Sequence, residues 1–355
     1  MWSFAIWDFK KNSIFIARDR FGEKPLYLLK ANSGIYFSSE IKFIKSLSKL
    51  KLDINYDKLV KNLSLGYKSL YKDDELFYKN VYELKASEYL VIGHDKIEKK
   101  VNFWKPNIKI NQNLSENEAI NETKRLLLKS MKYQVRSDVP LAFTLSGGVD
   151  SSSICSIAAK ELNLKIKTFS IIDSDERYDE RDNIKKTIKD LNCEHDFYTF
   201  DLKQSMDSLS ELENLTSYHE KPISTITSFV QSFLMKRIND QNYKVTFSGT
   251  SADELFTGYY DHFLLQLAAI SKDKEYLNCL EDWKKNILKF IRNPILKDPN
   301  LYIQKPKYRD HIFDGKNEIK DYLVEANDYN FSENEYSKDI LKNRMLNELF
   351  VEATP

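Results

Sequence analysis

The sequence predicts an α/β protein in which a mainly β region at the amino end is followed by a doubly wound parallel sheet with added helices. Two observations support this prediction. Short apolar runs bounded by turn residues fill the first hundred or so positions. From residue 115 onward, apolar strands alternate with helical patterns, which is typical of a parallel sheet covered by helices.

The first region, residues 1–102, is expected to form a domain built from hairpins. Alternating apolar runs separated by turn residues such as Asn32-Ser33-Gly34 predict the pairing of successive strands. The expected strands cover 4–7, 14–17, 26–29, 35–37, 81–84 and 88–92, in three successive pairs. Short helices are expected at 40–48 and 56–65. The polar stretch 103–114 has no clear period and is expected to be a linker.

The second region, residues 115–355, is expected to begin with a helix. Ser115 and Glu118 have the spacing of a capping box, and apolar residues then recur at helical spacing. The strands that follow are expected at 141–145, 165–172, 194–200 and 243–247, and the helices between them at 151–162, 179–191 and 225–238. Residues 263–355 are expected to be mostly helical.

Composition excludes several classes of protein. The net charge is +1, so no basic face for nucleic acid or membrane is predicted. No apolar run is long enough to span a bilayer, and the amino end lacks the pattern of a signal peptide. The three cysteines lack metal-ligand spacing. We therefore expect a cytoplasmic protein with small-molecule partners.

A glycine-rich turn follows the apolar strand 141–145 and runs directly into a helix. Gly147 and Gly148 are two of only nine glycines in 355 residues, and adjacent glycines allow a ligand to approach the backbone closely. Backbone N–H groups and the helix N-terminus there would bind phosphate. No lysine follows, so this is not the loop of kinases and GTPases. Asp150 requires a cation beside the phosphate, which predicts Mg²⁺.

A second turn repeats this arrangement after the strand 243–247. The segment Ser248-Gly249-Thr250-Ser251-Ala252-Asp253 combines small residues with an acid. If both turns lie at the same edge of the sheet, Asp150 and Asp253 can together hold a Mg²⁺. Alternatively, Asp253 and Glu254 are only a solvated helix start, where acidic residues are favourable.

Together the two motifs resemble the glutamine-hydrolysing asparagine synthetase family. Ser-Gly-Gly-x-Asp-Ser-Ser at 146–152 and Ser-Gly-x-x-Ala-Asp-Glu-Leu-Phe-x-Gly-Tyr at 248–259 match its synthetase domain in order. Phe4-Ala5-Ile6-Trp7-Asp8 and the segment from Ala17 to Tyr27 resemble its glutaminase domain. Further matches are Tyr178-Asp179-Glu180 and Glu220-Lys221-Pro222, so the resemblance covers essentially the whole chain.

The resemblance implies a fold, a reaction and its cofactors. Residues 1–102 would be the carboxyl-terminal part of a class II glutaminase domain of the Ntn type, and 115–355 an ATP-pyrophosphatase synthetase domain. In the family, ATP adenylates the side-chain carboxylate of aspartate, and ammonia released from glutamine displaces AMP to give asparagine. ATP and Mg²⁺ are the implied cofactors. A second copy of the chain, in a homodimer, is a further expected partner.

The resemblance also assigns residues to the site. Pyrophosphate would be bound by Ser146, Gly147, Gly148, Asp150, Ser151 and Ser152. Asp150 and Asp253 would hold Mg²⁺. The ATP pocket would be lined, through backbone contacts, by Thr144, Ile171, Ser248 and Gly249. Ile171 is equally consistent with an ordinary core residue.

Two departures from the family concern the ends of the chain. The family's N-terminal cysteine nucleophile has no counterpart, since Met1 matches an internal methionine of the glutaminase pattern. The family's synthetase domain continues beyond Pro355 and includes a lysine that the resemblance implies is catalytic. The sequence is therefore expected to be a fragment truncated at both ends, with little or no activity alone.

A third departure concerns the carboxylate that is amidated. Asparagine-forming members usually carry Glu at the position of Thr250 and Gly at that of Ser251, and Thr250 cannot act as a general base near neutral pH. Either another residue serves, or the acceptor is a different carboxylate, such as a uronic acid in surface-polysaccharide assembly. A non-catalytic nucleotide-binding module is a further alternative.

Overall fold

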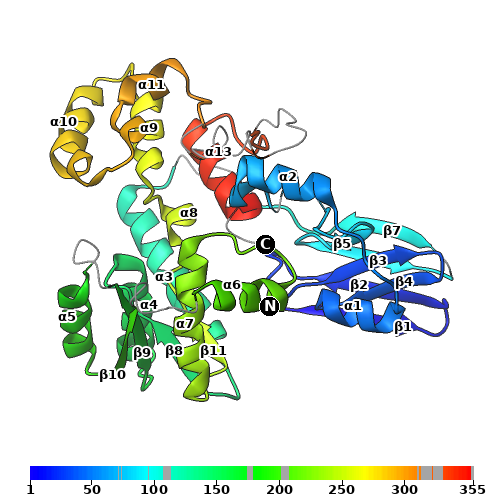
Figure 1. The fold of residues 1–355 in the computed structure, drawn as a ribbon. Helices are drawn as coiled ribbons and strands as arrows, with labels where there is room; N and C mark the ends of the chain where they lie inside the picture. The colour runs from blue at the N-terminus through cyan, green and yellow to red at the C-terminus, as the bar shows by residue number, and fades with distance from the viewer. Residues whose placement is uncertain are drawn as a thin grey trace. The chain divides into compact units, whose positions relative to one another are not determined.

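The computed structural model describes residues 1–70, 72, 74–94, 96–106, 113–173, 179–200, 208–309, 312, 322 and 331–352. By compactness the chain divides into a first unit, Met1–Pro106 with Asp253–Pro355, and a second unit, Asn107–Ala252. Figure 1 shows the elements of both. Much of the predicted linker and Tyr178 lie outside the described residues. The sequence domains 1–102 and 115–355 stay a prediction.

The first unit contains a four-stranded antiparallel sheet. Its strands, in spatial order, are β1 (Ser3–Asp8), β2 (Ser13–Arg18), β6 (Glu88–Ile92) and β7 (Ile97–Asn102). The hairpin β1–β2 was predicted. The strand β7 was not, because its sequence, Ile-Glu-Lys-Lys-Val-Asn, is mostly charged and lies largely exposed at the sheet edge.

A second sheet in this unit has three antiparallel strands, β4 (Gly34–Ser38), β3 (Tyr27–Ala31) and β5 (Val81–Glu83). The hairpin β3–β4 is confirmed. The predicted pairing of 81–84 with 88–92 is wrong, because β5 pairs with β3 and β6 pairs with β2. The two sheets share one core, made by Ile16, Leu26, Leu28, Leu84, Leu90 and Ile92.

Helices complete the first unit. Helix α1 (Ile41–Ser48) buries Ile41 and Ile44 against Leu29 and Val81 of the second sheet. The other helical elements are α2 (Tyr56–Leu65), η1 (Tyr67–Ser69), α9 (Tyr260–Ala269), α10 (Tyr276–Asn286), η4 (Leu288–Phe290), η5 (Pro294–Lys297), α11 (Pro299–Gln304), α13 (Ile340–Asn347) and η7 (Glu348–Glu352). Leucines of α9, Trp283 and Tyr302 form a separate core among the C-terminal helices.

The second unit contains the parallel sheet that the sequence predicts. Its spatial order is β10 (Glu194–Phe200), β9 (Lys167–Asp173), β8 (Leu141–Thr144) and β11 (Val245–Phe247), and all three pairings are parallel. The helices are α3 (Glu116–Gln134), α4 (Val149–Ser156), η2 (Ile157–Glu161), α5 (Arg181–Leu191), α6 (Ser208–His219) and α7 (Ile226–Asp240). They alternate with the strands as predicted, except that α6 lies between β10 and α7 where no helix was expected.

Helices cover both faces of this sheet, as the alternation of side chains along β8 requires. Phe143 packs with residues of α3, α4 and α5 on one face, while Ala142 packs with Leu234 and Ile238 of α7 on the other. Figure 1 shows α7 in front of β8 and β11. The chain is therefore doubly wound, and the ends of β8 and β11 lie side by side.

Local signals account for several element boundaries. Ser115 and Glu118 form the predicted capping box of α3. The helix predicted at 151–162 is instead α4, which ends at Ser156, followed by a wider helical turn over 157–161.

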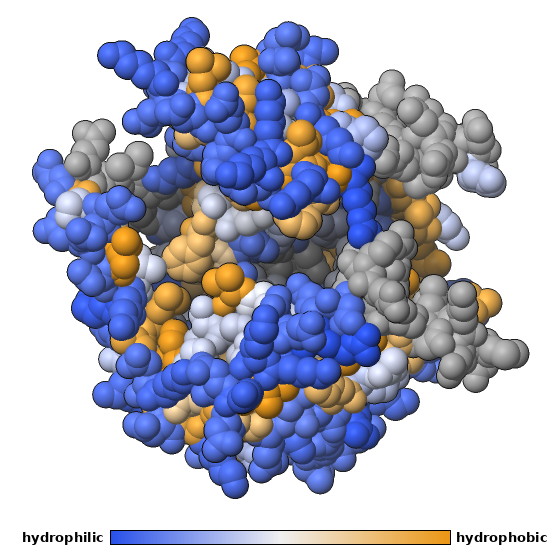
Figure 2. Space-filling model, turned by 90° about the vertical axis from the view of Figure 1, so that its left-hand side faces the viewer, coloured by the Kyte–Doolittle hydropathy of each residue, from blue (hydrophilic) through white to orange (hydrophobic). Residues whose placement is uncertain are grey.

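No described helix combines the length and apolarity that crossing a membrane requires. On the face shown in Figure 2, hydrophilic residues predominate and hydrophobic residues form small separate patches.

Candidate functional site

The glycine-rich turn between β8 and α4 depends on the conformation of Gly147. This residue has φ +87°, which a side chain disfavours. A Cβ there would also lie 3.2 Å from the backbone oxygen of Glu180 and 3.1 Å from its Cβ. The helix begins at Val149 without a side-chain cap on its first N–H groups. These N–H groups and the turn lie where the sequence predicts an anion site, which stays a prediction.

Hydroxyl groups fix the shape of this turn. The Ser146 backbone N–H donates to Ser151 Oγ at 3.1 Å, and Ser151 Oγ donates to the Gly148 carbonyl at 3.3 Å. Ser151 is buried, whereas Ser146 is exposed and Ser152 half-buried. The Ser151 hydroxyl therefore holds the loop, and the hydroxyls of Ser146 and Ser152 are the ones accessible to a ligand.

The second small-residue turn packs directly against the first. A Cβ on Gly249 would lie 2.8 Å from the backbone nitrogen of Ser151 and 3.0 Å from Asp150 Cβ. Thr144 Oγ1 donates to the Phe247 carbonyl at 3.2 Å and so ties the two strand ends together. The structure thus brings the turns after β8 and β11 into contact, and only glycine at 249 allows that approach.

Asp150 and Ile171 face different surroundings. Asp150 is half-buried, and among the described residues its carboxylate has no hydrogen bond or ion pair. Carboxylate oxygens suit Mg²⁺, so this group fits the predicted cation.

The side chain of Ile171 packs against the core that contains Phe169 and Leu234. Only the backbone of Ile171 is therefore left to line a nucleotide pocket.

Ser251 has a strained backbone beside this site. Its φ is +73°, a conformation that costs a residue other than glycine about 1–2 kcal/mol. Thr250, the neighbouring residue, accepts a hydrogen bond from Ser248 Oγ at 3.0 Å and is exposed. The turn therefore keeps a backbone conformation suited to glycine although serine occupies the position.

We expect Ser251→Gly to raise the free energy of unfolding of the second unit by roughly 0.5–1 kcal/mol, because relief of the left-handed strain exceeds glycine's extra unfolded-state entropy. Thermal unfolding followed by circular dichroism measures the change. Ser251→Ala retains the strain and serves as the control. Equal stability of the two variants would contradict this explanation.

Asp253 belongs to the first unit, and its pairing with Asp150 on a cation stays a prediction. It lies in α8 (Ala252–Phe256). A Cβ on Gly258 would lie 1.6 Å from Asp253 Oδ1, so glycine at 258 leaves room for this carboxylate. Glu254 is buried and accepts a 2.7 Å hydrogen bond from the Tyr259 hydroxyl. Glu254 and Tyr259 of the motif thus support the loop between them.

The Arg18-Asp19 pair of the N-terminal motif has a structural role. Arg18 is buried, pairs with Glu83 at 2.9 Å, and donates to the carbonyls of Lys24 and Leu84. Burial alone would raise the pKa of Asp19, but backbone N–H donors, among them those of Trp2 and Lys24, lower it below the usual value. These two side chains fix the loop that precedes β3.

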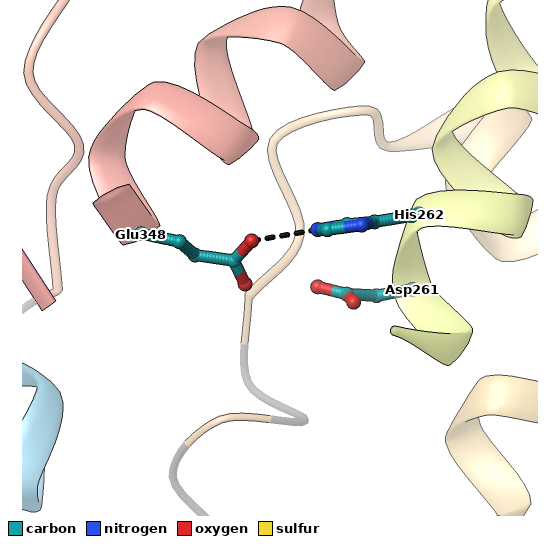
Figure 3. A group of neighbouring side chains, drawn as sticks. All are labelled: Asp261, His262 and Glu348. Atoms are coloured by element: carbon teal, nitrogen blue, oxygen red, sulfur yellow. Dashed lines mark hydrogen bonds and ion pairs between the residues drawn. The ribbon is translucent and has the colours of Figure 1, made fainter. Parts of the chain in front are cut away.

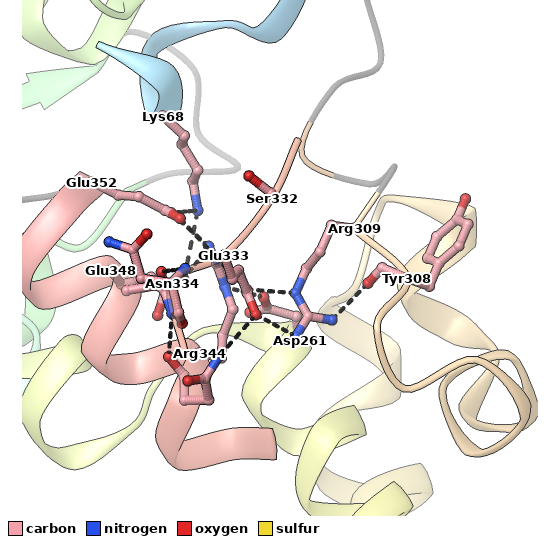
Figure 4. A network of polar contacts seen from close by, with 12 residues as sticks. Lys68, Asp261, Tyr308, Arg309, Ser332, Glu333, Asn334, Arg344, Glu348 and Glu352 are labelled. Carbon is pink, nitrogen blue, oxygen red and sulfur yellow. Dashed lines mark hydrogen bonds and ion pairs between the residues drawn. The ribbon is translucent and has the colours of Figure 1, made fainter. Parts of the chain in front are cut away.

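A buried ionic network in the first unit was not predicted from the sequence (Figure 4). Arg344 of α13 is fully buried and pairs with both oxygens of Glu352, at 2.9 and 2.8 Å. It also pairs with Glu348 at 2.8 Å. Further members are Asp261 of α9, Lys68 of η1, Glu333 and Arg309. Burial opposes its charge, but the surrounding carboxylates raise the pKa of Arg344.

Part of this network has the composition of a metal site. Asp261, His262 and Glu348 are buried with ligand atoms close together, and Figure 3 shows them pointing toward one another. His262 Nδ1 accepts from the Gly258 N–H at 3.3 Å, so its proton lies on Nε2, which donates to Glu348 at 2.6 Å. Two side-chain cations already lie beside these carboxylates, since Arg344 pairs with Asp261 at 3.5 Å and with Glu348 at 2.8 Å, and Lys68 pairs with Glu348 at 3.5 Å.

Cys155 provides no alternative nucleophile. All three cysteines are free, and Cys155 is buried in the core of the second unit. Burial raises the pKa of the Cys155 thiol to about 12. A thiol with that pKa is unreactive at neutral pH.

Comparison with known proteins agrees with this arrangement. A family model described as asparagine synthase matches residues 122–328. A second model, described as a glutamine amidotransferase domain, matches residues 1–104. The first includes both turns of the candidate site, and the second includes the two antiparallel sheets.

Individual relatives agree with the family models. A provisionally named glutamine-hydrolyzing asparagine synthetase 2 of Methanocaldococcus jannaschii is 32% identical over 87% of this chain and 58% of its own length. Glutamine-hydrolyzing asparagine synthetase 1 of Bacillus subtilis is 30% identical over 73% of this chain and 39% of its own. The amidase chyE of Penicillium rubens is 25% identical over 72% and 39%. The chain thus spans about 58% of the first relative and belongs to the asparagine synthase family.

Proposed function

We propose that this chain is part of an ATP-dependent amidotransferase that adenylates the side-chain carboxylate of aspartate and transfers ammonia to it. The observation that carries the proposal is the contact between the two turns, where Gly249 lies against the start of α4. That contact places Asp150 and the α4 N-terminus beside the ends of β8 and β11. In parallel α/β sheets, ligands bind at that edge.

The proposed reaction has two steps, adenylation of aspartate and displacement of AMP by ammonia. An aspartate carboxylate oxygen attacks the α-phosphorus of ATP, pyrophosphate leaves, and ammonia then attacks the acyl carbon and displaces AMP. The uncapped N–H groups of α4 and the Ser146 and Ser152 hydroxyls would bind the departing pyrophosphate as its charge develops. Asp150 and Asp253 would hold Mg²⁺, which neutralises phosphate charge when bound. Glutamine is the proposed source of ammonia in the complete enzyme.

The reaction is tested by exchange of labelled pyrophosphate into ATP. Adenylation without amide formation reverses, so label should enter ATP when aspartate and Mg²⁺ are present. The chain should be assayed with each carboxylate in turn. Exchange with aspartate supports the proposal. Its absence with every carboxylate would favour a nucleotide-binding module without catalysis.

Asp150→Asn is expected to weaken binding of Mg²⁺-ATP at least about tenfold, or 1.4 kcal/mol, because the variant loses the charge that attracts the cation. Isothermal titration with and without Mg²⁺ measures this. Asp138→Asn, which removes an exposed charge elsewhere in the second unit, is the matched control. Equal weakening in both variants would remove Asp150 from the proposed site.

The turn at 250–251 favours a second candidate for the carboxylate that is amidated, a uronic acid. Thr250 is uncharged and bonded to Ser248, so it supplies no base to an incoming amine. The amidase chyE matches the chain at lower identity, and its name does not specify aspartate. We therefore include a uronic acid in the exchange assay. Exchange with glucuronate and not with aspartate would show that the enzyme adenylates a uronic acid instead of aspartate.

A further inference from the structure

The first unit contains a pocket of about 240 Å³ that the proposed adenylation does not use. It lies where the loops around Arg18 and Ser87 meet Trp104 and the end of η7 at Phe350. Five of its lining residues are basic and one is acidic. The basic residues are Arg18, Arg20, Lys72, Lys85 and Lys105, and the acidic one is Glu83.

Among the described residues, two of these cations form ion pairs with carboxylates. Arg18 pairs with Glu83 at 2.9 Å, and Lys85 pairs with Asp74 at 2.7 Å. Among the described residues, the side chains of Arg20 and Lys105 have no hydrogen bond or ion pair. The pocket therefore retains an excess of positive charge, which favours an anionic ligand.

Lys72 adds a partly desolvated ammonium to the pocket. It donates to the Ser332 carbonyl, and its Nζ lies 3.4 Å from the centre of the Phe331 ring. Burial lowers the pKa of Lys72 to about 8, although the carboxylates of Glu352 and Glu333 act in the opposite direction. An anion bound nearby would offset this loss of hydration.

Aromatic rings form another wall of the pocket. Trp104 and Tyr336 lie 6.2 and 6.0 Å from Phe350, measured between ring centres. The backbone of Arg20 is held in place, because its carbonyl accepts a 3.0 Å hydrogen bond from the buried Ser87 hydroxyl. The rings and the backbone of Arg20 are thus arranged before any ligand binds, which reduces the ordering cost of binding.

We propose that this pocket binds a small organic phosphate, with its phosphate on Arg20, Lys72 and Lys105 and its ring against Trp104. Arginine binds phosphate oxygens through two N–H groups, and aromatic faces stack on nucleobases and sugars. The volume is at the small end of ligand pockets, so one ring with one phosphate fits better than a dinucleotide. The proposal does not depend on the adenylation site.

The test uses uridine 5′-monophosphate, ribose 5-phosphate and inorganic phosphate as probes, titrated separately by calorimetry and tryptophan fluorescence at low ionic strength. We expect saturable binding of at least one organic phosphate, tighter than that of inorganic phosphate, with a fluorescence change that Trp104→Phe abolishes. A preference for the uridine or the ribose compound identifies the ring. No saturation with any probe overturns the proposal, and equal affinity for inorganic phosphate overturns the stacking contact.

Variants locate the binding. The double variant Arg20→Ala/Lys105→Ala is expected to weaken binding at least about tenfold. Lys10→Ala/Lys51→Ala removes the same charge from exposed positions outside the pocket and should leave affinity unchanged. Asp150→Asn should also leave it unchanged, which separates this pocket from the proposed ATP site. Equal losses in the two double variants would mean nonspecific attraction and overturn the proposal.

Discussion

Arg344→Met is expected to lower the free energy of unfolding of the first unit by about 3–5 kcal/mol, because it removes from several buried carboxylates the buried cation that they share. Arg344 is fully buried and contacts Glu348 and Glu352 at 2.8 Å each. Urea unfolding followed by tryptophan fluorescence measures the effect. All four tryptophans of the chain, Trp2, Trp7, Trp104 and Trp283, lie in the first unit, so the signal reports on that unit alone.

Two further variants make this result specific. Lys11→Met removes a cation from an exposed ion pair with Asp8, and exposed pairs contribute little. Glu348→Gln/Glu352→Gln, added to Arg344→Met, removes two of the stranded charges and should recover part of the lost stability. If Arg344→Met unfolded at the same urea concentration as Lys11→Met, the network would contribute nothing to stability.

Gly249→Ala is expected to weaken Mg²⁺-ATP binding at least about tenfold and to destabilise the second unit by about 1–3 kcal/mol. Its Cβ would meet the Ser151 nitrogen at 2.8 Å, and that backbone cannot rotate away as a side chain could. The turns would have to separate, which moves Asp150 and the α4 N-terminus relative to β11. Calorimetric titration and hydrogen exchange in residues 141–156 measure the two effects.

The matched control is Gly93→Ala. There a Cβ would lie 2.0 Å from Glu98 Oε1, the far end of a flexible side chain, so a rotation of Glu98 removes the clash. Neither ATP binding nor exchange in the second unit should change. Normal Mg²⁺-ATP affinity in Gly249→Ala would show that the contact between the turns is unnecessary for the proposed function.

Local sequence signals predicted the strands of the parallel sheet and several helices of both units. The strands of the parallel sheet are apolar because helices bury both faces of the sheet, and the helices between them are amphipathic because only one side of each helix is buried. The strand 194–200 and the helix 56–65 have the predicted bounds. The glycine positions were informative because Gly147 and Gly249 are sites where a side chain does not fit.

Other features depend on which distant segments meet, and a local pattern carries no such information. The sequence of residues 81–83 suits a strand that pairs with β6 or with β3, and only the folded chain shows that it pairs with β3. The partners of Arg344 come from α9, from residue 333 and from η7. From the sequence alone, the charged residues of these segments cannot be told from solvent-exposed helix residues, because composition does not show which side chains become buried.

The ion pairs between Lys68 and the end of the described chain, at 3.5 Å to Glu348 and 3.4 Å to Glu352, also constrain the order of events during synthesis. A ribosome releases the amino end first, so Lys68 leaves the exit tunnel long before either carboxylate exists. The continuous middle segment, Asn107–Ala252, can collapse as soon as it emerges. The strands made earliest can bury their apolar faces in their own shared core, but Lys68 and the rings of Phe21 and Trp104 lack their partners until η7 is made.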